Sequence, residues 1–314
     1  MNTKNLLLFS LALSTASYTL FAQELEKEQQ LDSVIISSTR IDLPFSENSR
    51  TITVITSKDI KNSAANNVAD LLQQVTGVDI RRRGTAGMQA DLYIRGGGFD
   101  QTLLLIDGIK VEDGQTGHHT MNMALPLEVI ERIEIIKGPA ARVFGQNAFT
   151  GAINIVTKKN TENVVSLNVQ GGSYGQLNGS VTVGSQLENS SHFIQASRNT
   201  SDGYRYNTDY DNQNYFIKSS FNTNKTPINL LTIFSERKFG ANGFYASPSA
   251  TEQYEETQTS LIGISSEIKK EKLTLKPRLY WRRNQDMYVF VRSDPSIYRN
   301  LHQTNKIGAA LDAS

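Results

Sequence analysis

Hydrophobic positions follow two different patterns along the chain. Residues 41–158 contain short apolar runs separated by glycine-rich loops, whereas residues 159–314 alternate apolar and polar side chains over longer stretches. Short runs of β-branched and aliphatic residues bounded by turn formers predict strands. In the first region we expect such strands at Thr51–Thr56, Val78–Arg81, Asp91–Ile94, Thr102–Ile106, Arg132–Ile136 and Ala152–Thr157, and a short helix at Leu125–Ile130.

Helix-start signals between these strands make the first region an α+β unit. Ser57 is placed to cap a short helix, and Asn67 to cap a second helix over Val68–Val75. Asp70 then lies in the first turn, where a negative charge favours the helix N-terminus. Gly77 suits the left-handed position that follows a helix.

The second region alternates with a period of two. Val165, Leu167 and Val169 are separated by polar residues, and Leu279 lies beside Arg278. A transmembrane barrel requires this alternation, because lipid faces one side of each strand and a wet lumen faces the other. A soluble β-sandwich shows the same pattern with its polar face in water. The residues alone leave both interpretations open.

The expected connections in this region alternate in length. Long segments at Ser201–Asp211, Lys238–Gln253 and Asp286–Asn300 alternate with short ones at Leu187–Ser190, Asn222–Thr226 and Lys269–Lys272. Outer-membrane barrels have long external loops and short periplasmic turns. We expect about eight strands, with a bulge or bend at Pro277, which cannot donate a ladder hydrogen bond.

The chain begins with a continuous apolar stretch, Leu6–Ala22, preceded by Lys4. This layout predicts a secretory signal peptide at residues 1–22, cleaved after Ala22 or after Ala16. A buried N-terminal helix is the alternative. A polar tail follows, and within Asp32–Arg40 the β-branched centre predicts a short strand. That strand is either a free edge for pairing with another chain or the first strand of the next domain.

Composition removes several classes of function. The chain has 314 residues, 32 Lys+Arg, 31 Asp+Glu and no cysteine. The length indicates about two domains, and the near-zero net charge gives no general attraction to nucleic acid. Absent cysteine excludes disulfide scaffolds, thiolate metal sites and cysteine nucleophiles. A hydrophobic content of 38% argues against a helical membrane protein.

Two local motifs suggest chemistry that their surroundings do not support. Gly96–Gly98 follows a predicted strand, but another strand comes next, so no helix N-terminus is available for a phosphate. His118 and His119 are adjacent and have no carboxylate at metal-ligand spacing, so we interpret them as a loop pair. No Ser-His-Asp or paired-carboxylate arrangement has a recognisable context, which predicts that the protein is not an enzyme.

Several motifs in order resemble one family. Asp32–Arg40 resembles the TonB box of TonB-dependent outer-membrane receptors. Asp91–Gly96 and Thr102–Gly108 resemble two paired strands of their plug domain. Ile130–Pro139, Phe144–Gly145 and Gly151–Thr157 resemble its C-terminal signature. The resemblance covers residues 32–158.

The resemblance implies a fold class and a domain organisation. These are an α+β plug domain at 41–158, preceded by a periplasmic tail at 23–40, and antiparallel transmembrane β-barrel strands at 159–314. Such a plug lies inside a barrel of about 22 strands. At ~9–11 residues per strand, the residues after 158 are too few for that number. We therefore expect an incomplete 22-stranded barrel and an N-terminal fragment of a longer receptor.

The resemblance also implies function, partners and location. We expect TonB-dependent uptake of a scarce nutrient in the cell outer membrane, with outer-membrane lipid around the strands. TonB and its inner-membrane energising complex are the implied protein partners, and no nucleic acid is expected. The segments Arg237–Tyr245, Gln253–Glu255 and Tyr280–Asp286 most resemble receptors of the cobalamin branch, which implies cobalamin or a related corrinoid as cargo. Their aromatic side chains offer contact area for such a large ligand. A ferric siderophore is the alternative cargo, and a non-transporting surface binding protein is the alternative of another class.

Candidate site residues follow from this resemblance. The TonB-binding residues are Asp32, Ser33, Val34, Ile35, Ile36, Ser37 and Ser38. The substrate-binding residues, on the plug's apical loops Gly84–Ala90 and Val111–Met123 and one barrel loop, are Gln89, Gln115, His118, His119, Phe244 and Tyr245. No cofactor is expected except calcium, for which the candidate ligands are Asp202, Asp209 and Asp211, with a solvated acidic loop as the alternative.

Overall fold

The computed structural model describes residues 35–36, 43–44, 52–84, 88–122, 125–139, 144–159, 162–222, 226–245, 247–271 and 273–313. By its contacts the chain divides into Met1–Val34 and Ile35–Ser314, and all described residues belong to the second unit. The predicted signal peptide, and Asp32, Ser33, Val34, Ser37 and Ser38 of the predicted TonB box, therefore lie outside the described residues. No described helix is long and apolar enough to cross a membrane.

Residues 52–159 form an α+β domain around a five-stranded sheet. In sheet order its strands are β3 (Ile52–Thr56), β8 (Ile130–Lys137), β9 (Gly151–Thr157), β6 (Thr102–Ile106) and β7 (Ile109–Lys110). Only β6 and β9 pair in parallel within this sheet. All five residues of β6 are buried, as expected for a strand that is covered on both faces.

A separate two-stranded sheet contains β4 (Val78–Arg83) and β5 (Gln89–Ile94). The prediction that Asp91–Gly96 and Thr102–Gly108 form paired strands is therefore wrong. Burial explains the difference: β6 has no polar face beyond its first residue, so it takes a place inside the larger sheet. The β5 strand instead pairs antiparallel with the strand that directly precedes it.

Two short helices pack on this domain, α2 (Ser57–Asn62) and α3 (Val68–Gln73). The cap of α2 is Thr56 rather than the predicted Ser57, because Thr56 and Asp59 exchange hydrogen bonds in a capping box. Asn67 caps α3 as predicted, accepting from the Asp70 amide at 2.9 Å. Gly77 has the expected positive φ, +82°.

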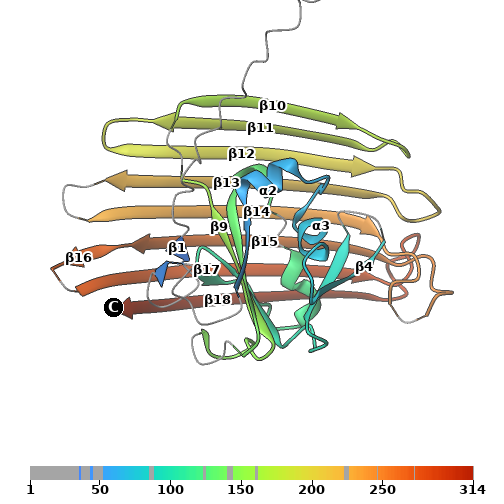
Figure 1. Ribbon diagram of the computed structural model, residues 1–314. Coiled ribbons are helices and arrows are strands. Elements are labelled where there is room, and N and C mark those ends of the chain that lie inside the picture. Colours follow the sequence, from blue (N-terminus) through green and yellow to red (C-terminus); the bar gives the residue numbers. More distant parts are fainter. Residues whose placement is uncertain are drawn as a thin grey trace, which may run out of the picture. The chain divides into compact units, whose positions relative to one another are not determined.

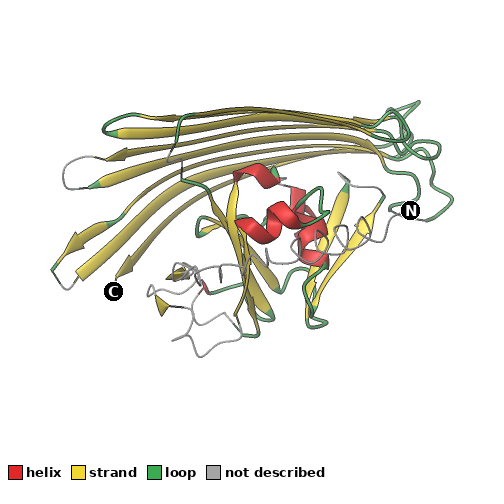
Figure 2. Ribbon diagram, turned by 45° about the horizontal axis from the view of Figure 1, so that its top comes forward, coloured by secondary structure: helices red, strands yellow, loops and turns green. Residues whose placement is uncertain are grey.

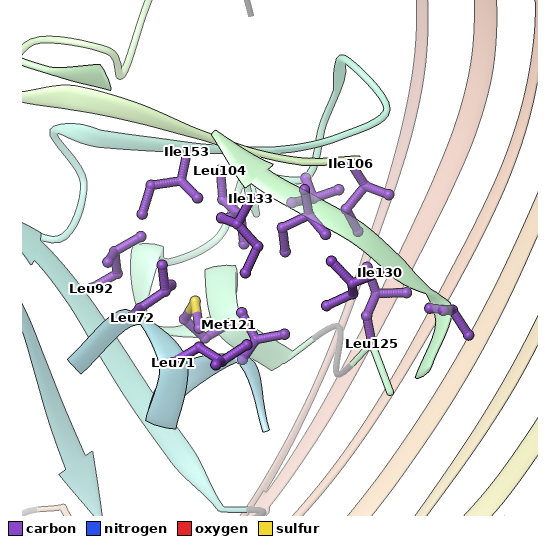
Figure 3. Packing of buried hydrophobic residues seen from close by; sticks show 14 of the residues in the cluster. Leu71, Leu72, Leu92, Leu104, Ile106, Met121, Leu125, Ile130, Ile133 and Ile153 are labelled. Carbon is purple, nitrogen blue, oxygen red and sulfur yellow. The ribbon is translucent and has the colours of Figure 1, made fainter. Parts of the chain in front are cut away.

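Apolar side chains from helices and strands meet in one core. Leu71 and Leu72 of α3 point toward Leu104, Ile133 and Ile153 of the sheet (Figure 3). The helices lie among the short strands of the domain (Figure 2). Two 3-10 helices complete it, η2 (Gly117–Asn122) and η3 (Leu127–Val129), and η3 occupies part of the helix predicted at Leu125–Ile130.

The described strands that follow the α+β domain form a large antiparallel sheet, called the strand wall below. They are β10 (Val164–Gly171), β11 (Leu177–Gln186), β12 (Ser190–Ser201), β13 (Tyr210–Asn222), β14 (Pro227–Gly240), β15 (Tyr254–Ser266), β16 (Ile268–Lys270), β17 (Leu273–Val289) and β18 (Arg299–Ala313). Figure 1 shows the long strands side by side in sequence order, while the short β16 pairs with β17 beyond the end of β15. The structure thus confirms the predicted fold class of an α+β domain followed by antiparallel strands.

The strand wall has two chemically different faces. Apolar side chains are exposed on one face, with Leu167 72% and Ile307 76% exposed. The opposite face carries buried polar residues and packs on the α+β domain, whose core cluster also contains Phe216 and Leu261. An apolar outer face and a polar inner face are the arrangement that lipid requires of a membrane strand.

Pro277 interrupts a ladder without shifting it. Ser265 pairs with Arg278 and Ile268 pairs with Leu275, so the register of β15 and β16 on β17 is unchanged across the gap. The predicted bulge at this proline is therefore not observed, and the alternative of a local bend stays a prediction. Because Pro277 has no N–H, the residue pairs on the β15 side are missing at this point, whereas the pairing with β18 continues through Pro277.

Candidate functional site

The long connections 202–209, 241–253 and 290–298 all join strands at one end of the strand wall, called the apical end below. Glu255 lies near the start of β15, and Asp286 lies near the end of β17, so both belong to this end. The η2 helix of the α+β domain lies between them. Its residue His119 has Nε2 3.5 Å from Asp286 Oδ2 and Nδ1 3.9 Å from Glu255 Oε1.

Local chemistry explains how η2 is placed. The Asp113 carboxylate accepts from the Gln115 amide at 2.8 Å and from the Thr116 amide at 3.4 Å, which forms a turn directly before the helix. Gly117 begins η2, where a Cβ would lie 2.5 Å from the ring of Phe99. A side chain at that position would push the segment away from its neighbours.

His119 is the centre of a buried polar cluster. Its side chain is 6% exposed, and Glu255 and Asp286 are similarly buried. Burial disfavours the protonated imidazole, but the hydrogen bond to Asp286 and the charges of Glu255, Asp286 and Asp113 outweigh it, so the pKa of His119 is raised. The cluster therefore favours positive charge at the imidazole position.

Tyr245 joins this cluster from the 241–253 connection. Its hydroxyl donates to Glu255 Oε2, and its ring meets the edge of Tyr288 at 5.5 Å. The Arg83 guanidinium lies 5.6 Å from the Tyr245 ring centre and donates to the Phe244 carbonyl. Burial and the nearby Glu255 carboxylate raise the pKa of Tyr245 well above its usual value, so it remains a hydrogen-bond donor.

The other predicted substrate residues differ in their accessibility. Gln115 is exposed and its Nε2 lies 3.1 Å from His302 Nδ1. His118 is partly exposed, stacks on Phe99 at 4.2 Å and contacts Asp91 at 2.7 Å. Gln89 is buried and lines a recess of about 170 Å³.

Phe244 is buried among Met88, Tyr210 and Phe239. The structure thus brings His119 and Tyr245 together through Glu255, while Gln115 is exposed and His118 and Tyr245 are partly exposed. The assignment of all six as substrate-binding residues stays a prediction.

The three aspartates predicted to bind calcium do not meet. Arg198 donates to both carboxylate oxygens of Asp211, at 2.9 and 2.7 Å. Arg292 does the same to Asp209, at 2.6 and 2.9 Å. Guanidinium groups therefore occupy the oxygens that calcium needs. Calcium at Asp202, Asp209 and Asp211 stays a prediction without an assembled ligand set.

Charged side chains of the strand wall reach into the α+β domain, which sequence reasoning missed. Arg282 Nη1 lies 3.1 Å from Asp113 Oδ2 and donates to the Glu112 carbonyl at 3.1 Å, while Lys306 pairs with the Glu112 carboxylate. Lys218 lies 2.9 Å from Asp107 Oδ2. The only available signal was that Arg and Lys occupy the face opposite the apolar residues.

Sequence reasoning also missed Glu255 and Asp286 as partners of His119. The interpretation of His118 and His119 as a loop pair without nearby carboxylates is wrong for both residues. Asp91 of β5 contacts His118, and two strands far along the chain supply the carboxylates beside His119. Local spacing carries no signal for such a meeting.

Comparisons with known proteins identify the α+β domain. Residues 44–152 match the family model described as TonB-dependent Receptor Plug Domain. The chain is 32% identical over 184 residues to the vitamin B12 transporter BtuB of Vibrio vulnificus (strain CMCP6), covering 57% of this chain and 29% of that protein. It is 34% identical over 134 residues to BtuB of Vibrio cholerae serotype O1 (strain M66-2), covering 43% and 22%. The chain thus spans less than a third of these relatives.

Solved structures share the fold at low sequence identity. The ferripyoverdine receptor of the outer membrane of Pseudomonas aeruginosa has a TM-score of 0.67 at 16% identity, covering 82% of this chain and 37% of that chain. The closed form of the ferric-catecholate import receptor Fiu from E. coli K12 has a TM-score of 0.66 at 19% identity, covering 88% and 44%. These similarities extend the shared fold from the α+β domain to the strand wall.

Proposed function

The chain belongs to the TonB-dependent outer-membrane receptors through its plug domain, and on that premise we propose that it serves TonB-dependent uptake of a corrinoid of the cobalamin class. The matched family consists of transport receptors rather than enzymes. The observation that carries the proposal is the plug-type domain packed on the polar face of a strand wall whose other face is apolar.

The cargo class rests on the relatives. Two relatives with more than 30% identity over parts of this chain are vitamin B12 transporters. The solved structures of siderophore receptors resemble the fold below 20% identity, so they do not distinguish among cargoes. The exposed Gln115 and the partly exposed His118, which stacks on Phe99, offer polar and aromatic contacts for a large ligand.

Energy must come from a partner, because the outer membrane holds no nucleotide pool. We assign the coupling role to Asp32–Ser38, with TonB and its inner-membrane complex supplying the work. Ile35 and Ile36 form β1, which pairs with β2 (Leu43–Pro44) in a ladder of two residue pairs, outside the five-stranded sheet. The short ladder supports the interpretation that this segment can exchange its pairing partner. It argues against the alternative, in which the segment is the first strand of the α+β domain.

Binding and transport are tested on the full-length receptor. Titration with cyanocobalamin beside a ferric siderophore identifies the cargo class, and uptake of labelled cobalamin in cells with and without TonB tests the coupling. We expect cobalamin binding without TonB and accumulation only with it. Binding of the ferric siderophore but not of cyanocobalamin would identify a siderophore as the cargo. A receptor that is found in the membrane fraction but binds neither nutrient would favour a non-transporting surface protein.

A further inference from the structure

We propose that His119, Glu255 and Asp286 form a binding site for a divalent transition-metal ion of the zinc type, which fastens the α+β domain to the strand wall. The three residues come from η2, β15 and β17. One ligand atom from each lies within 4.8 Å of the others, and all three side chains are buried. This inference is independent of the cargo.

The distances fit a metal site. His119 has Nε2 3.5 Å from Asp286 and Nδ1 3.9 Å from Glu255. Since only one imidazole nitrogen binds a given ion, the relevant measure is the 4.8 Å within which one ligand atom from each of the three residues lies. Ligands at about 2.0 Å from a tetrahedral zinc ion are about 3.3 Å apart, so the side chains need to close by at most about 1.5 Å. Such a change is within the reach of side-chain rotation.

A second observation is a buried carboxylate oxygen in the site that has no hydrogen-bond partner among the described residues. Asp286 is 5% exposed, and its Oδ1 is buried without a hydrogen-bond partner among the described residues. Glu255 lies beside it, so two carboxylates share one dry environment. Burying a carboxylate costs free energy unless it is paired or binds a metal. A divalent ion between the two would satisfy both groups at once.

His302 of β18 extends the ligand set. Its Nδ1 lies 3.5 Å from Asp286 Oδ2, and its side chain is 43% exposed. The chain has four histidines, and two of them contact the same carboxylate. Two imidazoles and two carboxylates, with no cysteine in the chain, match the nitrogen and oxygen preference of Zn²⁺ rather than Cu⁺ or Ca²⁺.

An ion at this position would link three elements. It would join the η2 segment, which also carries His118, to two strands of the wall. Metal binding stabilises the arrangement that presents its ligands, so the ion would hold η2 at the apical end. Loss of the ion would release the same segment.

The experiment measures zinc binding by the full-length receptor, purified with a histidine-free affinity tag and stripped with a chelator. We expect calorimetry with ZnCl₂ to show about one site per chain and at least tenfold weaker binding in Asp286→Asn and Glu255→Gln. The matched control is Glu256→Gln, which changes the neighbouring carboxylate on the opposite face of β15 and should bind like the wild type.

Cobalt absorption keeps the test decisive if a variant misfolds. We expect the wild-type receptor with Co²⁺ to show visible bands typical of tetrahedral coordination, lost on adding equimolar Zn²⁺. Heat-modifiable migration of each variant reports its folding. Absence of both zinc binding and cobalt bands in the wild type overturns the proposal, as does undiminished zinc affinity in a folded Asp286→Asn variant.

Discussion

The ion pair between Arg282 and Asp113 holds the segment that carries the predicted ligand contacts, and its removal should release that segment. The two side chains are 1% and 0% exposed, so water does not screen their interaction. Arg282→Met removes the cation and keeps most of the aliphatic volume. It leaves the Asp113 carboxylate buried without its charged partner, and it removes a donor to the Glu112 carbonyl.

The size of the effect follows from burial and from the hydrogen bonds that remain. Breaking a buried ion pair costs about 3–5 kcal/mol. Asp113 keeps two backbone donors, the amides of Gln115 and Thr116, so the lower end of that range applies. About 3 kcal/mol corresponds to a roughly 100-fold larger population of the open segment.

Hydrogen exchange measures this population in the full-length receptor. We expect amides within 111–122 to exchange roughly 100-fold faster in Arg282→Met, with the five-stranded sheet unchanged. Adding Asp113→Asn removes the unpaired charge but keeps the oxygen that accepts from the turn, so exchange should return to within about tenfold of the wild type.

A matched control is available on the next residue. Arg283 lies on the opposite face of β17 and donates to Gln303 at 2.7 Å. Arg283→Met should leave exchange in 111–122 at the wild-type rate. If Arg282→Met also exchanges at that rate, the buried pair does not hold the segment and the reasoning fails.

Three further predictions follow. Ile35→Pro removes an amide donor from the β1 segment and should abolish energised cobalamin uptake while surface binding stays intact. Burial raises the pKa of Glu112, but the hydrogen bond and charge of Lys306 lower it more, so the pKa lies below its ordinary 4.5. The ionised Glu112 therefore stabilises the folded state above pH 4.5, and this stability is lost as the pH falls through the pKa of the folded state. Acid unfolding of Glu112→Gln beside the wild type measures this loss. Gly151→Ala places a Cβ 2.4 Å from the Ile136 carbonyl and should lower unfolding stability by about 1–3 kcal/mol in thermal scans.

Each of these predictions has its own contrast. Ile35→Val keeps the strand and should transport nearly normally, whereas normal uptake by Ile35→Pro would remove the coupling role from Asp32–Ser38. An unchanged acid transition in Glu112→Gln would contradict the sign argument. Gly179→Ala adds a Cβ with no atom within 4 Å, so equal losses at Gly179 and Gly151 would exclude crowding as the cause.

Local features of the sequence determined the type of most elements. Alternation at Val165, Leu167 and Val169 predicted a strand with one apolar face, and the structure exposes those side chains in β10. Asn67 and Gly77 predicted a helix start and a left-handed turn, and both are observed. These features depend on neighbours within a few residues, so the sequence carries them directly.

Partner choice depended on the tertiary structure. The β5 and β6 strands follow one another but lie in different sheets, because the apolar β6 needs cover on both faces. A short apolar run shows that a strand is buried, but not which strand it pairs with. The missing bulge at Pro277 has a similar cause, since the pairs on either side of the gap keep the register.

The polar cluster at the apical end was also decided by tertiary structure. Resemblance to a family pointed to His119 and Tyr245, but the sequence gives no sign that Glu255 and Asp286 meet them. The two carboxylates lie on separate strands, and each has its neighbours set by register over a long ladder. Alternation determined that they face inward, and only the packing of η2 against β15 and β17 placed an imidazole between them.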